Sequence, residues 1–111
     1  MRHVDVLIIG GGPGGAACAY GLRRRGIDCL ILERERFPRL KLCGGLVTQH
    51  AAFALGLKPS EYPYGWLWVD RFDFHFRRFT LPVPSPQISI RRFEFDAFLV
   101  QRAGVEVVEH R

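Results

Sequence analysis

The order of apolar and polar positions along the chain predicts an α/β fold. Val4–Ile9 is a short run rich in β-branched residues that ends at a glycine, a pattern typical of a central strand buried on both faces. Small residues and Leu22 favour a helix over Gly14–Arg25, and Gly26 is suited to end it. Cys29–Leu32 is a second apolar strand, so this part of the chain is predicted to form a right-handed βαβ unit.

The next patterns predict a short helix and an antiparallel hairpin. Leu46–Leu55 can form the helix, which Gly56 would stop. Arg71–Arg77 alternates three phenylalanines with polar residues, which indicates a strand with one solvated face. Phe79–Val83 is expected to return as its partner. An extended and poorly paired connection should follow, because prolines cannot donate to a β-ladder; these are Pro82, Pro84 and Pro86.

The last third of the chain predicts one more helix and one more strand. Ile88–Ile90 forms a short strand at most. Four apolar residues then fall at helical spacing, and Gly104 should end that helix before a strand begins over Val105–Val108. The helical positions are Phe95, Phe98, Leu99 and Ala103.

Composition describes a globular protein in a reducing compartment. Hydrophobic residues make up 48% of the chain, yet no apolar run approaches the roughly 20 residues of a membrane span, and the interpretation is a cytoplasmic protein. The net charge of +5 comes from arginines spread over every segment, which argues against nucleic-acid binding. Cys18, Cys29 and Cys43 lack metal-ligand spacing, so neither a metal site nor a disulfide framework is expected.

A glycine-rich turn carries the strongest chemical signal. Gly10, Gly12 and Gly15 satisfy G-x-G-x-x-G directly after a strand and at the start of a helix, and Pro13 and Gly14 complete the same turn. The first glycine permits the tight turn, the second lets a pyrophosphate approach the main chain, and the third lets helix and strand pack closely. The sequence therefore predicts a dinucleotide-binding site formed by these five residues.

An acidic residue follows at the end of the second strand. Glu33 lies eighteen positions past the last glycine, where a carboxylate can accept hydrogen bonds from the adenosine ribose and favours a free 2′-hydroxyl. Arg34 leaves two readings open, because it can pair with a 2′-phosphate or lie on the surface. A nicotinamide dehydrogenase would continue with another helix and parallel strand, whereas this chain enters a loop and a hairpin, which favours FAD.

Four segments together resemble the amino-terminal part of the geranylgeranyl reductase family. They are VLIIGGGPGG, LILERERFP, KLCGG at Lys41–Gly45 and RRFEFDAFL at Arg91–Leu99. The last segment matches R-x-x-F-D-x-x-L through Arg92 and Asp96. The family belongs with the FAD enzymes of p-hydroxybenzoate hydroxylase type. The resemblance implies a Rossmann-like FAD-binding βαβ fold with an inserted antiparallel hairpin, incomplete at the carboxyl end, and residues 1–111 as the amino-terminal portion of an FAD/NAD(P)-binding domain.

The resemblance also implies further site residues. The backbone after Cys43, through Gly44, Gly45 and Leu46, would lie near the flavin, and Arg92 would help to hold the cofactor. Cys43 is the candidate catalytic residue, with Lys41 as a neighbour that favours its thiolate and as a further cofactor contact. The alternatives at these positions are a small residue in a crowded loop for Cys43, a shaped turn for the glycines and a surface residue for Arg92.

The expected function is that of an FAD-dependent oxidoreductase that reduces isoprenoid double bonds, acting on a small-molecule or isoprenoid-lipid substrate with an undefined reductant. Rival readings are a flavin monooxygenase or halogenase, a quinone-linked electron-transfer dehydrogenase, an NAD(P)-binding dehydrogenase and a non-catalytic truncated fragment. Later family segments are absent before Arg111. We therefore expect the 111-residue chain by itself to be inactive and to self-associate, and expect any contact with a membrane surface to involve the missing part.

Overall fold

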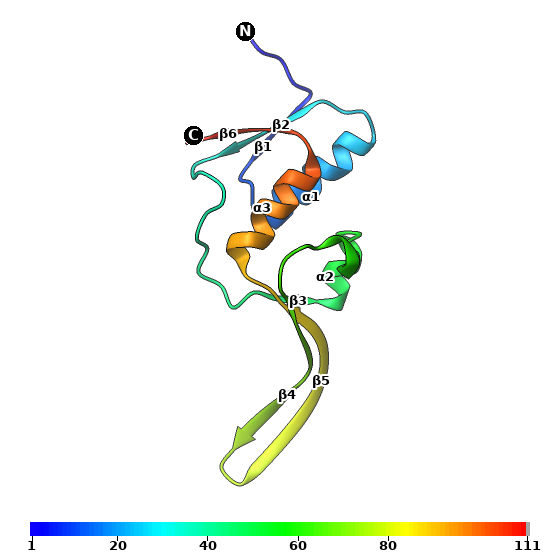
Figure 1. The fold of residues 1–111 in the computed structure, drawn as a ribbon, viewed down its shortest axis with the longest axis vertical. Coiled ribbons are helices and arrows are strands. Elements are labelled where there is room, and N and C mark those ends of the chain that lie inside the picture. Colours follow the sequence, from blue (N-terminus) through cyan, green and yellow to red (C-terminus); the bar gives the residue numbers. More distant parts are fainter. Residues whose placement is uncertain (111) are drawn as a thin grey trace. The chain divides into compact units, whose positions relative to one another are not determined.

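The computed structural model describes residues 1–110, which form two compact units (Figure 1). The first unit combines Met1–Lys41 with the chain from Arg92 onward, and the second is Leu42–Arg91. Among the described residues, no helix is both long enough and apolar enough to cross a membrane.

The first unit contains a parallel sheet of three strands. These are β1 (Val6–Ile9), β2 (Cys29–Glu33) and β6 (Glu106–Glu109), in the order β1-β2-β6. Residue Ile31 of β2 lies opposite both Ile8 and Val107. The prediction of a parallel α/β sheet is confirmed, but the prediction of a central first strand is wrong. Both apolar runs look equally buried in the sequence, and only the pairing with β6 places β2 in the middle.

Two helices cover one face of this sheet and lie side by side (Figure 1). They are α1 (Pro13–Arg24) and α3 (Arg92–Ala103). Ala19 and Ala103 are fully buried in the core with the inward side chains of β1 and β2. Alanines at these two positions let the helices approach the sheet closely, because a larger side chain would need space that a close-packed core does not have.

The opposite face of β1 is open. Leu7 and Ile9 are 51% and 75% exposed, whereas Ile8 between them is 8% exposed. Successive side chains of a strand point to opposite faces, so this alternation follows from a sheet that is covered on one side. The expectation that this strand is buried on both faces is therefore wrong for the described residues.

The second unit is built on an antiparallel sheet with the order β3-β5-β4. Its strands are β3 (Leu46–Thr48), β4 (Leu67–Phe76) and β5 (Phe79–Ser89). Helix α2 (Gln49–Ala54) and a 3₁₀ turn (Pro59–Glu61) connect β3 to β4. The helix predicted over Leu46–Leu55 begins three residues late, because Leu46–Thr48 pairs with β5 and the hydroxyl of Thr48 caps α2 by accepting from the Ala51 amide at 3.1 Å.

The hairpin of β4 and β5 is longer than predicted (Figure 1). The proline-containing stretch continues the strand, with Asp73 opposite Pro82 and Arg71 opposite Pro84. Pro82 and Pro84 are two residues apart, so both missing donors lie on one edge of β5, an edge that β3 pairs only over Gln87–Ser89. Pro86 lies where the register of β4 and β5 shifts, between the pair of Arg71 with Pro84 and the pair of Val69 with Gln87. The expectation of an extended connection is confirmed. The expectation of poor pairing is wrong at Pro82 and Pro84, because it ignored this period, whereas the pairing is irregular around Pro86.

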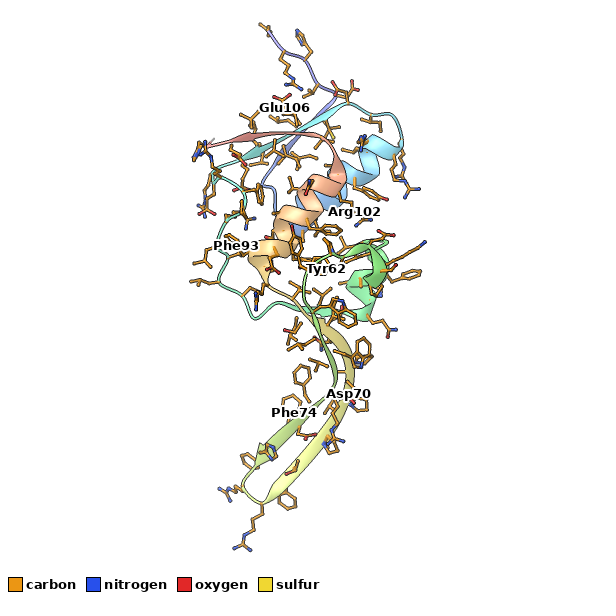
Figure 2. All side chains as sticks on the ribbon, in the orientation of Figure 1. Tyr62, Asp70, Phe74, Phe93, Arg102 and Glu106 are labelled. Atoms are coloured by element: carbon orange, nitrogen blue, oxygen red, sulfur yellow. The ribbon has the colours of Figure 1, made fainter. Side chains whose placement is uncertain are left out.

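The predicted phenylalanine alternation does form a strand, but its apolar face is not covered by the described residues. Phe74 and Phe76 are 58% and 70% exposed. Figure 2 shows Phe74 projecting from the hairpin. Expected self-association of the chain is consistent with this uncovered aromatic surface.

Candidate dinucleotide-binding site

The glycine turn connects β1 to α1 in the first unit. Gly10 has a φ of +98°, a conformation that residues with side chains rarely adopt, and its N–H donates to the Leu32 carbonyl at 2.8 Å. A Cβ at Gly15 would overlap the Gly10 carbonyl oxygen and lie 3.3 Å from Cγ2 of Ile8. The first and third glycines of the motif are therefore required by the turn and by the packing of the helix on the strand.

The second glycine of the motif is not required by the packing of the protein. A Cβ at Gly12 would meet only the Nη2 atom of Arg39, at 3.8 Å, and one at Gly14 would meet nothing within 4 Å. Gly12 is the N-cap of α1, Pro13 is the first helical residue, and no side chain among the described residues caps this end. The turn thus leaves open space in front of backbone N–H groups and the positive end of the helix dipole, an arrangement that suits an anion.

Glu33 ties the glycine turn to the end of β2. Its Oε2 accepts from the Gly11 amide at 2.7 Å, and its Oε1 accepts from the Glu35 amide at 3.1 Å. The side chain is buried. A carboxylate oxygen can accept two hydrogen bonds, so Glu33 retains acceptor capacity for a ribose hydroxyl while it holds the turn in place.

The environment of Glu33 favours its charged form. Burial by itself raises the pKa of this carboxyl, but the amides of Gly11 and Glu35 and the guanidinium of Arg39 together outweigh it, so the pKa lies below its ordinary value. Glu33 is therefore a carboxylate at neutral pH, as an acceptor of ribose hydroxyls has to be.

A buried group of charges lies beside the turn. Arg92 makes two hydrogen bonds to Asp96, from Nε to Oδ1 at 2.6 Å and from Nη2 to Oδ2 at 2.9 Å. Arg39 donates from Nη1 to the same Oδ2 at 3.0 Å, and its Nε lies 3.9 Å from Oε1 of Glu33. Asp96 is only 1% exposed. One buried carboxylate therefore fixes two arginines next to the glycine turn.

Sequence analysis missed the roles of Arg39, Asp96 and Gly11. Asp96 is part of the motif R-x-x-F-D-x-x-L, but its ion pair with Arg92 depends on the helix beginning at Arg92, earlier than the predicted helical positions, which start at Phe95. Arg39 gave no signal, because it lies in an irregular segment and reaches Asp96 across 57 positions of sequence.

These residues surround one cavity of about 340 Å³ within the first unit. Its lining includes most of the predicted cofactor contacts of this unit together with Arg39, namely Gly10, Gly12, Glu33, Arg34, Lys41 and Arg92. Glu35 also lines it, so four basic side chains face two acidic ones. An excess of positive charge beside an uncapped helix end fits a pyrophosphate, and Glu33 at the strand end fits a ribose. The residues present thus fit the adenosine diphosphate half of FAD.

Pro13, Gly14 and Gly15 lie in the first unit outside the lining of this cavity, and the predicted residues Cys43, Gly44, Gly45 and Leu46 belong to the second unit. Gly45 has a φ of +74°, and a Cβ there would overlap the Ile90 carbonyl oxygen, so the local backbone requires Gly45. A Cβ at Gly44 would meet nothing within 4 Å. The Gly45 amide donates to Sγ of Cys43 at 3.4 Å. A flavin contact of Cys43, Gly44, Gly45 and Leu46 stays a prediction.

The three cysteines differ in their surroundings. Cys29 is buried, and burial raises the pKa of its thiol. Cys18 and Cys43 are exposed. Cys18 is exposed because α1 turns this residue to solvent and buries Ala16 and Ala19 instead. Over residues 1–110, no group of three His, Cys, Asp or Glu side chains could hold a metal ion.

Comparison with known proteins relates the chain to flavoproteins. Residues 8–79 match the family model described as NAD(P)-binding Rossmann-like domain. An uncharacterized protein of Methanosarcina barkeri is 43% identical over 106 residues. The 1H-pyrrole-2-carbonyl-[peptidyl-carrier protein] brominase of Pseudoalteromonas luteoviolacea is 29% identical over 124 residues. Digeranylgeranylglycerophospholipid reductase 1 of Methanopyrus kandleri is 30% identical over 115 residues. These alignments cover 93%, 100% and 93% of this chain, in that order.

Solved structures of flavoproteins share the fold of this chain. The structure of a flavin-dependent brominase superposes on 96% of this chain with a TM-score of 0.78 and 31% identity, and the chain covers 29% of it. A geranylgeranyl bacteriochlorophyll reductase-like protein of Thermoplasma acidophilum shares the fold, with a TM-score of 0.76 over 96% of this chain and 30% of its own, at 21% identity. The chain spans only 27%, 29% and 28% of the lengths of the three relatives named above.

Proposed function

Because the chain belongs to the family of NAD(P)-binding Rossmann-like domains, we propose that it supplies the adenosine diphosphate site of a geranylgeranyl-reductase-like flavoenzyme that saturates isoprenoid double bonds. The chain has the Rossmann-like fold of FAD-binding domains, and FAD is its cofactor. It would form the amino-terminal portion of such a domain in a flavin-dependent oxidoreductase. The observation that carries the proposal is that the glycine turn, Glu33 and the two arginines Arg39 and Arg92 line one and the same cavity.

Each part of the cavity has a role in holding the cofactor. The amides at the start of α1 would bind the pyrophosphate, and the open space at Gly12 would let it approach the backbone. Glu33 would accept from the ribose hydroxyls while it holds the turn through the Gly11 amide. Asp96 is a positioning residue, because it holds Arg39 and Arg92 at the cavity.

The chemistry of the reaction belongs to the flavin. When bound and reduced, FAD supplies a hydride that, with a proton from solvent, saturates one carbon–carbon double bond and leaves the flavin oxidised. The residues of this chain contribute binding and orientation. Cys43 is proposed to border the flavin, with its Sγ held by the Gly45 amide.

The reductase reading is supported by the digeranylgeranylglycerophospholipid reductase, which is 30% identical over 93% of this chain. The KLCGG and RRFEFDAFL segments support the same reading. A halogenase is the second candidate, because the brominase of Pseudoalteromonas luteoviolacea aligns with the whole chain at 29% identity. Both candidates use the same adenosine diphosphate site, so this site by itself does not choose between them.

Cofactor binding is tested first, with equilibrium dialysis of the chain against FAD, ADP and NADPH. We expect FAD and ADP to bind and to compete with each other, because the cavity fits the part that they share. NADPH should bind at least tenfold more weakly, since its 2′-phosphate would face Glu33. Binding of NADPH in preference to FAD would contradict the proposal.

The reaction is tested in a longer protein that contains this chain. After reduction of bound FAD with dithionite, anaerobic incubation with a digeranylgeranyl glycerolipid should add two hydrogen atoms per reaction, seen as mass increases of about 2 Da. The parallel incubation uses oxygen, bromide and a pyrrole acceptor. A brominated product in the second incubation, with an unchanged lipid in the first, would select the halogenase instead.

A further inference from the structure

The second unit contains an apolar pocket that the dinucleotide site does not use. Its volume is about 270 Å³, and all its lining residues belong to this unit. The floor is a row of three cross-strand neighbours, because Ile88 of β5 lies opposite both Val47 of β3 and Trp68 of β4. Ala52 and Phe53 of α2 form part of the wall.

The pocket combines a closed interior with an open aromatic rim. Leu57 and Tyr62, which follow α2, are 8% and 6% exposed. The rim consists of three aromatic side chains that remain largely open to solvent: Phe53, Trp66 and Trp68 are 84%, 41% and 56% exposed. Exposed aromatic faces around a concave apolar site are suited to contact another ring, since aromatic pairs gain from stacked and edge-to-face arrangements beyond the burial of area.

The charge of the lining restricts the ligand. Among the described residues that line the pocket, none is an acid, lysine or arginine, and the side-chain amides of Gln49 and Gln87 provide hydrogen-bonding groups. Gln87 is 9% exposed and donates to Oγ of Ser85 at 2.5 Å, which orients its amide. A charged ligand would lose its hydration without gaining a partner, so the occupant should be neutral.

The volume of the pocket restricts the size of the ligand. A dry apolar cavity of about 150 Å³ holds a benzene molecule. The larger volume of this pocket, about 270 Å³, therefore corresponds to two fused rings rather than one. We propose that the pocket between α2 and the three-stranded sheet is a binding site for a neutral bicyclic aromatic molecule, separate from the adenosine diphosphate site and independent of the proposed reductase function.

The chain carries its own reporter for this site. It has two tryptophans, Trp66 and Trp68, and both line the pocket. The neutral quencher 1-nitronaphthalene should therefore reduce the tryptophan fluorescence of the chain in a saturable way, with half-saturation on the order of 0.1 mM for a ligand of this size. N-acetyltryptophanamide in the same titration corrects for absorption and collisional quenching.

Two alanines of α2 provide a matched pair of variants. Ala52→Phe fills the pocket and should raise the half-saturating concentration at least tenfold, whereas Ala54→Phe adds the same ring at an exposed position outside the lining and should change it less than twofold. Phe53→Ala removes a ring of the rim that is 84% exposed, so it should leave the fold intact and raise the half-saturating concentration about threefold. FAD binding should be unchanged in all three variants, which separates this proposal from the function proposed above.

Four results would overturn the proposal. The first is quenching that rises linearly without saturation, and the second is an equal effect of Ala52→Phe and Ala54→Phe on the half-saturating concentration. The third is displacement of the quencher by octan-1-ol at the same concentration as by naphthalene, because this would indicate an acyclic hydrocarbon ligand. The fourth is a longer protein containing this chain that fails to bind naphthalene in dialysis while the chain binds it, because another polypeptide segment would then fill the pocket.

Discussion

Asp96 is the residue whose replacement should do most damage to the first unit. Asp96→Asn keeps the size of the side chain but removes its charge and replaces one acceptor oxygen by a donor. Three hydrogen bonds end on the carboxylate, two from Arg92 and one from Arg39. Arg39 is itself only 9% exposed in its side chain, so its charge would lose its closest partner without access to water.

The expected cost follows from this burial. Breaking a buried ion pair by removing one partner costs about 3–5 kcal/mol, compared with a total stability of about 5–15 kcal/mol for a domain. Arg39 keeps weaker contacts with Glu33 and Glu35, at 3.9 and 3.8 Å, so we expect the lower end, about 3 kcal/mol. With a urea slope of about 1.5 kcal/mol per M, the unfolding midpoint should fall by about 2 M.

Urea unfolding followed by far-ultraviolet circular dichroism measures this difference, and urea is preferable to guanidinium because guanidinium would screen the charges. The matched control is Asp73→Asn, which removes an exposed ion pair with Arg71 at 3.2 Å and should cost less than about 1 kcal/mol. A loss at Asp96 no larger than the loss at Asp73 would refute the reasoning that burial makes this carboxylate structural.

Three further predictions concern the cofactor site and the cysteines. Gly12→Val should lower the FAD content at least tenfold with little change in stability, because a Cβ there meets only an Arg39 nitrogen at 3.8 Å; full FAD content in dialysis would contradict this. Glu33→Gln should lower the free energy of unfolding at pH 7 by about 1.5–3 kcal/mol. Since the pKa of Glu33 is lowered in the folded protein, the difference in stability between the parent and Glu33→Gln is present above the ordinary pKa of 4.5. It disappears as the pH falls through the folded pKa. A series of urea midpoints in which this difference stays constant with pH would refute the prediction. Iodoacetamide should alkylate Cys43 faster than buried Cys29, and FAD should protect Cys43 in a longer protein that contains this chain; peptide mass spectrometry that finds equal rates, or no protection, would leave Cys43 as an ordinary loop residue.

The sequence by itself determined the parts of this protein that depend on neighbours along the chain. The run of apolar residues, the spacing of Gly10, Gly12 and Gly15 and the position of Glu33 predicted the βαβ unit and its anion site. The periodicity before Gly104 predicted the last helix, and the βαβ unit and this helix both match the structure. The anion site stays a prediction. These features are local, because turn geometry, helix ends and side-chain period are decided within a few residues.

Only the tertiary structure decided which residues meet across long separations. Two similar apolar strands could each be central, and the pairing with β6 chose β2. Pro82 and Pro84 suggested a break in the pairing, but both lie on one edge of β5. Arg39 reaches Asp96 over 57 positions, and Trp68 and Val47 line one pocket because β5 pairs with both β4 and β3. Such contacts depend on how the whole chain packs, which no local pattern specifies.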